Sequence, residues 1–266
     1  MPSDLVTFWG RCDLTAPPHA HPDDLPVLSR GSGKYIDAEP RTFESFVASG
    51  RFGDFTDHRL HLSLLPIPYG GNLAHADIIV LLLNPGFSYT DYYGEMRMPA
   101  FNRRLRMNLS QSFEGVEFPF LWLDPEFCWH GGFVWWEKKL REIITLIAAE
   151  RFKGRYLDAL RNLSTRLAHI ELVPYHSPSF RGHALINDLP SVNAARRFVQ
   201  DALVSAAQAG SKTIIVTRQE AAWGLPKPSE HLVIYKGGQT RGASLGPDTP
   251  GGKAILKRYG IETLAH

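Results

Sequence analysis

The stretch DIIVLLLNPGF, residues 77–87, decides the fold. Its six consecutive apolar residues, 78–83, are typical of a strand that is buried on both faces, as in parallel sheets. The run ends on Asn84, Pro85 and Gly86, and a proline has no backbone N–H with which to continue a ladder of hydrogen bonds. The sequence therefore predicts a buried strand that presents an asparagine amide at its carboxyl end.

Downstream of this stretch, three more strands alternate with helical patterns. The strands are predicted over residues 169–175, 212–217 and 231–235. One helix is predicted to begin at Pro99, and the others are predicted over residues 137–150, 155–167, 192–208, 219–223 and 251–260. Strands that alternate with helices are typical of a parallel sheet with helices on both faces. We therefore expect an α/β fold, a three-layer α/β/α sandwich with a four-stranded parallel sheet, over residues 71–266.

The first 70 residues have a different composition. They are rich in proline, glycine and polar residues, and their apolar residues show little periodicity. We expect residues 1–70 to form an irregular N-terminal arm that packs on the domain, with one short helix near residues 43–49.

Composition excludes several classes of protein. The chain has 266 residues, of which 44% are hydrophobic and 21% charged. Its net charge is only +2, so binding to DNA would need a local basic patch. Cys12 and Cys128 are too few for an iron–sulfur cluster or a four-cysteine metal site. No apolar run approaches the roughly 18 residues of a membrane span, and no signal peptide is recognised. We expect a cytoplasmic protein with no metal and no cofactor, and the oligomeric state stays open.

The residues that follow the predicted strands are the candidate site, because ligands of parallel sheets bind outside the carboxyl ends of the strands. Aromatic rings suit stacking on a base, amides and hydroxyls suit reading its edge, and cations suit phosphates. The candidates for the pocket are Asn84, Pro85, Gly86, Phe87, Tyr89, Tyr92, His176, Ser177 and Gln239. The candidates for phosphate binding are Arg181, Arg218, Lys236 and Arg241.

Two segments resemble the uracil-DNA glycosylase superfamily, particularly its mismatch-specific branch. LLLNPGF, residues 81–87, is similar to the first motif of that branch, and MPAFNRRLRMNL, residues 98–109, is similar to the helix start that follows it. The resemblance covers roughly residues 73–260. It implies that Asn84 orients a water molecule for attack on the glycosidic carbon, that Phe87 stacks on an extruded base, and that Asn102 supports the pocket.

The second motif of that family differs in this chain. The family carries His or Asn beside Pro and Ser after its last strand, where this chain reads YKGGQTRG, residues 235–242, and HSPS, residues 176–179, follows the second predicted strand instead. For the donor that stabilises the departing base, His176 is the first candidate and Gln239 the second. The leading hypothesis is a DNA glycosylase that hydrolyses the N-glycosidic bond of a damaged or mismatched base. The alternatives are a non-catalytic nucleic-acid or nucleotide-binding protein on the same fold, and a small-molecule hydrolase that uses His176.

Overall fold

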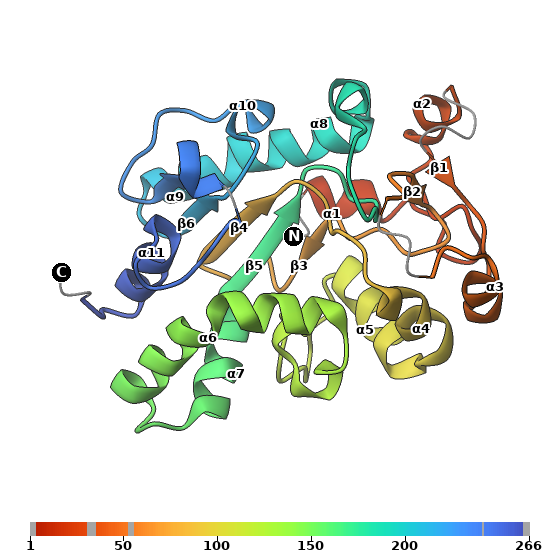
Figure 1. Cartoon of the computed structure of the whole chain (residues 1–266). Coiled ribbons are helices and arrows are strands. Elements are labelled where there is room, and N and C mark those ends of the chain that lie inside the picture. Colours follow the sequence, from red (N-terminus) through yellow and green to blue (C-terminus); the bar gives the residue numbers. More distant parts are fainter. Residues whose placement is uncertain (1–3, 31–35, 53–55, 241, 263–266) are drawn as a thin grey trace.

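A five-stranded sheet forms the centre of the computed structural model, which describes residues 4–30, 36–52, 56–240 and 242–262 (Figure 1). The strands lie in the order β3-β5-β4-β6-β7. They are β3 (Tyr69–Gly70), β4 (Ile78–Leu82), β5 (Leu167–Glu171), β6 (Thr213–Val216) and β7 (Leu232–Ile234). The last four are mutually parallel, so their carboxyl ends meet at one edge of the sheet.

The predicted number of strands is wrong by one. Tyr69 and Gly70 form β3, which pairs antiparallel with β5 at the edge of the sheet. This strand lies in the segment expected to be irregular, and its two residues are too few to produce any periodicity. The four strands predicted from apolar runs are present, and they form a mixed α/β fold with a sheet that is mostly parallel.

Helices cover both faces of the sheet (Figure 1). On one face pack α1 (Asp4–Trp9), α8 (Pro190–Arg197), α9 (Val204–Gln208) and α10 (Glu220–Trp223), with a π-helical segment, Phe198–Leu203, between α8 and α9. On the other face pack α5 (Pro99–Leu109), α6 (Gly131–Arg151), α7 (Tyr156–Arg166) and α11 (Pro250–Arg258). The alternation of apolar residues along the strands separates the two cores, because Ile79 and Leu81 face the first and Ile78 and Val80 face the second.

The N-terminal segment is more regular than expected. It contains α1, α2 (Leu25–Ser29), the predicted short helix as α3 (Phe43–Ala48), and a two-stranded parallel ladder of β1 (Ile36–Asp37) and β2 (Leu60–His61). Asp24 ties the segment to the core, because its buried carboxylate accepts hydrogen bonds from the Tyr175 hydroxyl (2.5 Å) and the Ser191 amide (2.9 Å). The segment therefore packs on the domain through buried polar contacts as well as apolar ones.

A helix that was not predicted follows the Asn-Pro-Gly loop. α4 (Tyr89–Arg97) begins at Ser88, whose side chain accepts a hydrogen bond from the Thr90 amide, while the Asp91 carboxylate accepts one from the Ser88 amide (2.6 Å). This reciprocal arrangement is a capping box.

The remaining elements are short 3₁₀ turns at Leu121–Leu123, Pro125–Phe127, His183–Asn187 and Gly237–Thr240.

Candidate active site

The Asn-Pro-Gly loop and the loop after β5 are joined by hydrogen bonds at the carboxyl end of the sheet. Asn84 Nδ2 donates to Ser177 Oγ (3.1 Å), and the Gly86 carbonyl accepts from the Ser177 amide (3.1 Å) and from His176 Nδ1 (3.1 Å). Gly86 has a φ of 72°, in the left-handed region that favours glycine. The loop turns there so that the Gly86 carbonyl meets two donors. Asn84 Oδ1 makes no hydrogen bond within the described residues.

A cavity of about 550 Å³ opens beside this loop, a volume in the range of small-molecule sites. Its walls come from the loops after β4, β5 and β6 and from the beginning of α6. The lining includes Asn84, Pro85, Gly86, Phe87, His176, Ser177 and Arg218 among the predicted residues, together with Asp91, Trp122, His130, Trp135, Trp136, His169, Glu171, Phe180 and Thr217. The structure thus brings seven of the predicted residues to one cavity.

A buried carboxylate links His176 to α6. Asp91 Oδ1 lies 3.1 Å from His130 Nε2, and Asp91 Oδ2 lies 3.6 Å from His176 Nδ1. His130 Nδ1 accepts a hydrogen bond from the Gly132 amide (3.0 Å), so the proton of neutral His130 is on Nε2 and faces Asp91. Burial alone would raise the pKa of Asp91, but His176, His130 and the Ser88 amide lower it overall. Asp91 is therefore an ionised carboxylate that is surrounded by N–H donors.

The tautomer of His176 limits what this residue can do. A carbonyl oxygen only accepts, so His176 Nδ1 carries the proton that it donates to Gly86. Burial lowers the pKa of His176, and its Nε2 is therefore unprotonated at neutral pH. Within the described residues, neither ring nitrogen is hydrogen-bonded to a Ser or Cys side chain, the arrangement that the hydrolase alternative requires. The contacts assign His176 to holding the Gly86 loop.

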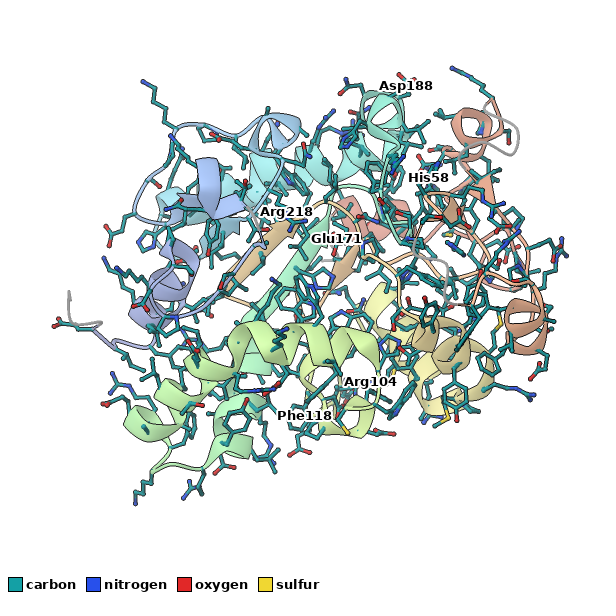
Figure 2. All side chains as sticks on the ribbon, viewed as in Figure 1. His58, Arg104, Phe118, Glu171, Asp188 and Arg218 are labelled. Carbon is teal, nitrogen blue, oxygen red and sulfur yellow. The ribbon has the colours of Figure 1, made fainter. Side chains whose placement is uncertain are left out.

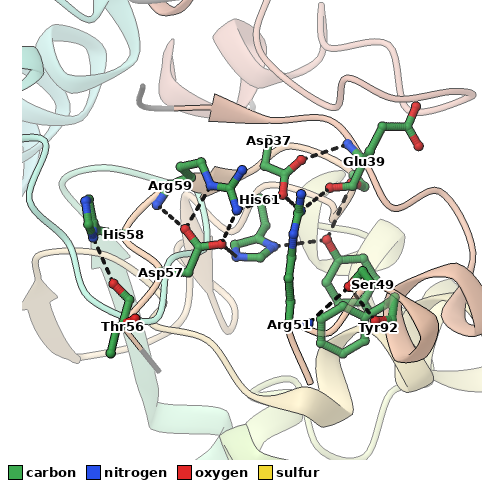
Figure 3. A network of polar contacts seen from close by, with 12 residues as sticks. Asp37, Glu39, Ser49, Arg51, Thr56, Asp57, His58, Arg59, His61 and Tyr92 are labelled. Atoms are coloured by element: carbon green, nitrogen blue, oxygen red, sulfur yellow. Dashed lines mark hydrogen bonds and ion pairs between the residues drawn. The ribbon is translucent and has the colours of Figure 1, made fainter. Parts of the chain in front are cut away.

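The N-terminal segment positions Phe87 in the cavity wall. The ring of His61, on β2, stacks on Phe87 with centroids 4.6 Å apart, and His61 Nδ1 lies 3.0 Å from the Tyr92 hydroxyl. Figure 3 shows how an ion-pair network surrounds His61, with Arg59 bound to Asp57 through two hydrogen bonds (2.9 and 2.7 Å). Burial lowers the pKa of His61 to about 4, so the ring that supports Phe87 is neutral.

Two polar side chains of β5 lie at the floor of the cavity. His169 and Glu171 alternate with apolar residues, so both face the side of the sheet that α6 covers, and Figure 2 labels Glu171 and Arg218 at the same end of the sheet. Glu171 Oε2 and both ring nitrogens of His169 are buried without a hydrogen-bond partner among the described residues. His169 Nε2 lies 3.7 Å from Glu171 Oε1, and the Trp136 ring stacks on His169 at 5.5 Å.

The close approach of β3 to this floor requires a glycine. An added Cβ at Gly70 would lie 2.8 Å from Nδ1 of His169, its partner across the antiparallel ladder. We predict that Gly70→Ala lowers the free energy of unfolding by about 1–3 kcal/mol, because His169 must leave its place between Trp136 and the strand. Urea denaturation measures the loss. Gly238→Ala is the matched control, because no atom of the described residues lies within 4 Å of the added Cβ there and the expected change is within about 0.5 kcal/mol. Equal stabilities of the two variants would contradict the tight contact.

The other predicted residues that the structure describes lie away from the cavity. Tyr92 is fully buried and stacks on Phe46 at 4.1 Å, and Tyr89 belongs to the same aromatic cluster, so both tyrosines attach α4 to the N-terminal segment. Asn102 Nδ2 donates to the Glu95 carbonyl (2.9 Å), and Gln239 Oε1 accepts from the Lys236 amide (3.1 Å). Arg181, Lys236 and Gln239 are exposed, and Arg241 lies outside the described residues.

Several lining residues escaped the sequence analysis. The tryptophans come from the aromatic stretch of residues 118–136, which has no periodicity of either strand or helix. Asp91 could have been found from the Ser-x-x-Asp pattern of the capping box. His169 and Glu171 could have been found as polar residues at alternate positions of an otherwise apolar strand, a pattern that places both on one face.

A metal site and a membrane-spanning helix are both absent from the parts of the chain that the structure covers. No three His, Cys, Asp or Glu side chains are grouped so that they could hold a metal ion. No helix in those parts has the length and apolar character needed to cross a membrane. Comparison of the chain with family models, with curated proteins and with solved structures gives no match.

Proposed function

We propose that this protein is an N-glycosylase that hydrolyses the bond between a base and its sugar in DNA. The observation that carries the proposal is the convergence of Asn84 with polar and aromatic side chains on one cavity at the carboxyl ends of the parallel strands. The resemblance of residues 81–87 and 98–109 to the uracil-DNA glycosylase superfamily supports the same reaction. An enzyme of this kind must extrude the base from the stack and hold it in a pocket, because the glycosidic carbon cannot be reached inside a duplex.

Asn84 is suited to orient the attacking water. Its Nδ2 is occupied by Ser177, so its amide plane is fixed and the free Oδ1 can accept a hydrogen bond from water. Phe87 and the tryptophans at the start of α6 offer faces on which a flat base can stack.

Glu171 is suited to stabilise the charge that develops on the departing base. Burial raises the pKa of its carboxyl well above the ordinary value, which favours the protonated form, an O–H donor inside the cavity. His176 was the first candidate for this role, but its proton is on Nδ1 and is bound to the Gly86 carbonyl. Glu171 replaces His176 as the proposed donor, and His176 becomes a positioning residue.

Arg181 and Lys236 are not among the lining residues, so fewer of the described cations lie at the cavity than expected. Arg218 lines the cavity, and Lys139 on α6 lies over the Trp135 ring at 4.5 Å. Arg218 lies at the cavity, where it could contact the phosphates that flank an extruded base, whereas the Lys139 ammonium donates to the Gly242 and Ala243 carbonyls. This concentration of groups around one pocket favours catalysis over a binding protein with an extended basic groove.

The test uses purified protein and labelled oligonucleotides, single- and double-stranded, that contain uracil, hypoxanthine, a G:T mismatch or an A:C mismatch. Base release leaves an abasic site, which alkali converts to a strand break. We expect breaks at one of the target bases and not in the matched duplex without a target. The absence of breaks in every oligonucleotide would contradict the proposed function.

A further inference from the structure

The floor of the cavity contains polar atoms that no protein group satisfies. Glu171 Oε2, His169 Nδ1 and His169 Nε2 are all buried without a hydrogen-bond partner among the described residues. Glu171 and His169 are only 3% and 1% exposed, and both line the cavity. Buried polar groups in folded proteins are nearly always hydrogen-bonded, so the unpaired Glu171 Oε2 at the cavity indicates a ligand that supplies its missing partner, whereas His169 Nδ1 faces Gly70 of β3.

The charge state of this floor defines which ligand it can take. No Lys or Arg forms an ion pair with Glu171 within the described chain. The basic side chain close to it is His169, whose Nε2 lies 3.7 Å from Glu171 Oε1. Burial raises the pKa of Glu171 well above its ordinary value and lowers the pKa of His169 to about 3, which favours the neutral form of both groups. A neutral carboxyl presents an O–H donor and a C=O acceptor side by side.

Two kinds of base edge match a neighbouring donor and acceptor. One is the lactam edge of uracil or hypoxanthine, with a ring N–H beside a carbonyl. The other is the amidine edge of cytosine or adenine, with an unprotonated ring nitrogen beside an amino group. The ring nitrogen of an amidine edge is basic, so it can share the carboxyl proton and turn both hydrogen bonds into charge-assisted ones. The lactam edge has no basic nitrogen, so its two hydrogen bonds to the carboxyl stay between neutral groups.

We propose that the cavity binds a base through an amidine edge and that Glu171 is the residue that reads it. The carboxyl O–H donates to the ring nitrogen and the carboxyl C=O accepts from the amino group. The ring lies beside Trp136, which already stacks on the neighbouring His169. The proposal rests on the proposed function in one respect, since it names the class of base that the glycosylase would take.

The first experiment measures binding of free bases to the wild-type protein by quenching of tryptophan fluorescence. Two matched pairs, adenine with hypoxanthine and cytosine with uracil, differ mainly in the edge. We expect at least one amino base to bind about tenfold more tightly than its lactam partner, the discrimination typical of a bidentate contact. Equal or tighter binding of the lactam bases, or no binding by any of the four, would overturn the proposal.

The second experiment uses Glu171→Gln, which keeps the shape of the side chain and keeps one donor beside one acceptor, but has no proton to share. We expect the preference for the amino base to fall to less than about threefold. A preference that survives in Glu171→Gln overturns the assignment of Glu171. Exposed Glu126→Gln is the matched control and should bind as the wild type does.

The pH dependence separates Glu171 from the other ionisable groups around the cavity. These groups are His169 on the same strand, Asp91 and His130 at the starts of α4 and α6, His176 after β5, and Arg218 after β6. Wild-type preference for the amino base should decline as the pH rises through the raised pKa of Glu171, because the donor is then lost. The preference of Glu171→Gln should stay flat over the same range, and equal pH profiles of the two proteins would count against the proposal.

The two proposals fail in different ways. A preference for an amino base without any base release from oligonucleotides would reject the glycosylase and keep the amidine reader. Release of uracil or hypoxanthine at rates that Glu171→Gln leaves unchanged would keep the glycosylase and reject the amidine reader.

Discussion

Replacement of Asn84 by alanine is expected to slow base release by about 10²–10³-fold, the loss typical of one positioned hydrogen-bonding group in an active site. The loss follows from geometry, because Ser177 fixes the amide of Asn84 and leaves Oδ1 as the atom that can orient water. Single-turnover cleavage of the oligonucleotide that the wild type cuts best gives the rate directly. Binding of the same oligonucleotide should change little, because the aromatic walls of the cavity remain.

Two further variants isolate the role of Asn84. Asn84→Asp keeps an oxygen at the same place and should retain much more activity than Asn84→Ala, whereas exposed Asn193→Ala on α8 should cleave at the wild-type rate. An Asn84→Ala protein that is folded and still cleaves within a factor of about three would show that another group orients the water.

The sequence predicted β4 clearly because its apolar run is uninterrupted and is buried on both faces. His169 and Glu171 interrupt β5, which was predicted over residues 169–175 and lies at Leu167–Glu171. β3 could not be predicted, because Tyr69 and Gly70 become a strand only through pairing with β5, about 100 residues away in the chain. The residues around Tyr69 therefore contain no local signal for that pairing.

The candidate site was predictable where it follows the strands. Asn84, Phe87, His176 and Arg218 reach one cavity because the carboxyl ends of parallel strands meet at one edge. Tyr92 was misplaced because its segment is a helix rather than a loop, and that helix turns the ring into the N-terminal segment.

The opposite wall of the cavity had no predictable position. It comes from the turn before α6, which reaches the sheet only through tertiary packing of its aromatic residues. Helix α6 itself was predicted six residues too short at its N-terminus, so Trp135 and Trp136 were left outside it. Without that first turn, the sequence offered no reason to place tryptophans beside Asn84.

Replacement of Asp91 by asparagine is expected to lower the free energy of unfolding by about 1–3 kcal/mol, the cost of leaving a buried donor without a partner. Every neighbour of the Asp91 carboxylate is a donor, namely His130 Nε2, His176 Nδ1 and the Ser88 amide. An asparagine NH₂ group must then face a donor in either orientation, and a buried donor is left without a partner. Urea denaturation at pH 7 measures the loss, with exposed Glu126→Gln as the control of unchanged stability.

The pH dependence of this loss has a definite sign. The pKa of Asp91 is lower in the folded protein than its ordinary value of 3.8, so Asp91 contributes its full stability above that value. This contribution disappears as the pH falls through the lower, folded value. The difference between wild type and Asp91→Asn should therefore be constant from pH 7 to about pH 5 and shrink only below about pH 4. A difference that grows as the pH falls from 7 towards 5 would mean that a protonated histidine, rather than the carboxylate alone, controls this contact. Because Asp91 holds His176, and His176 holds the Gly86 carbonyl, the same variant should also loosen the loop that carries Asn84.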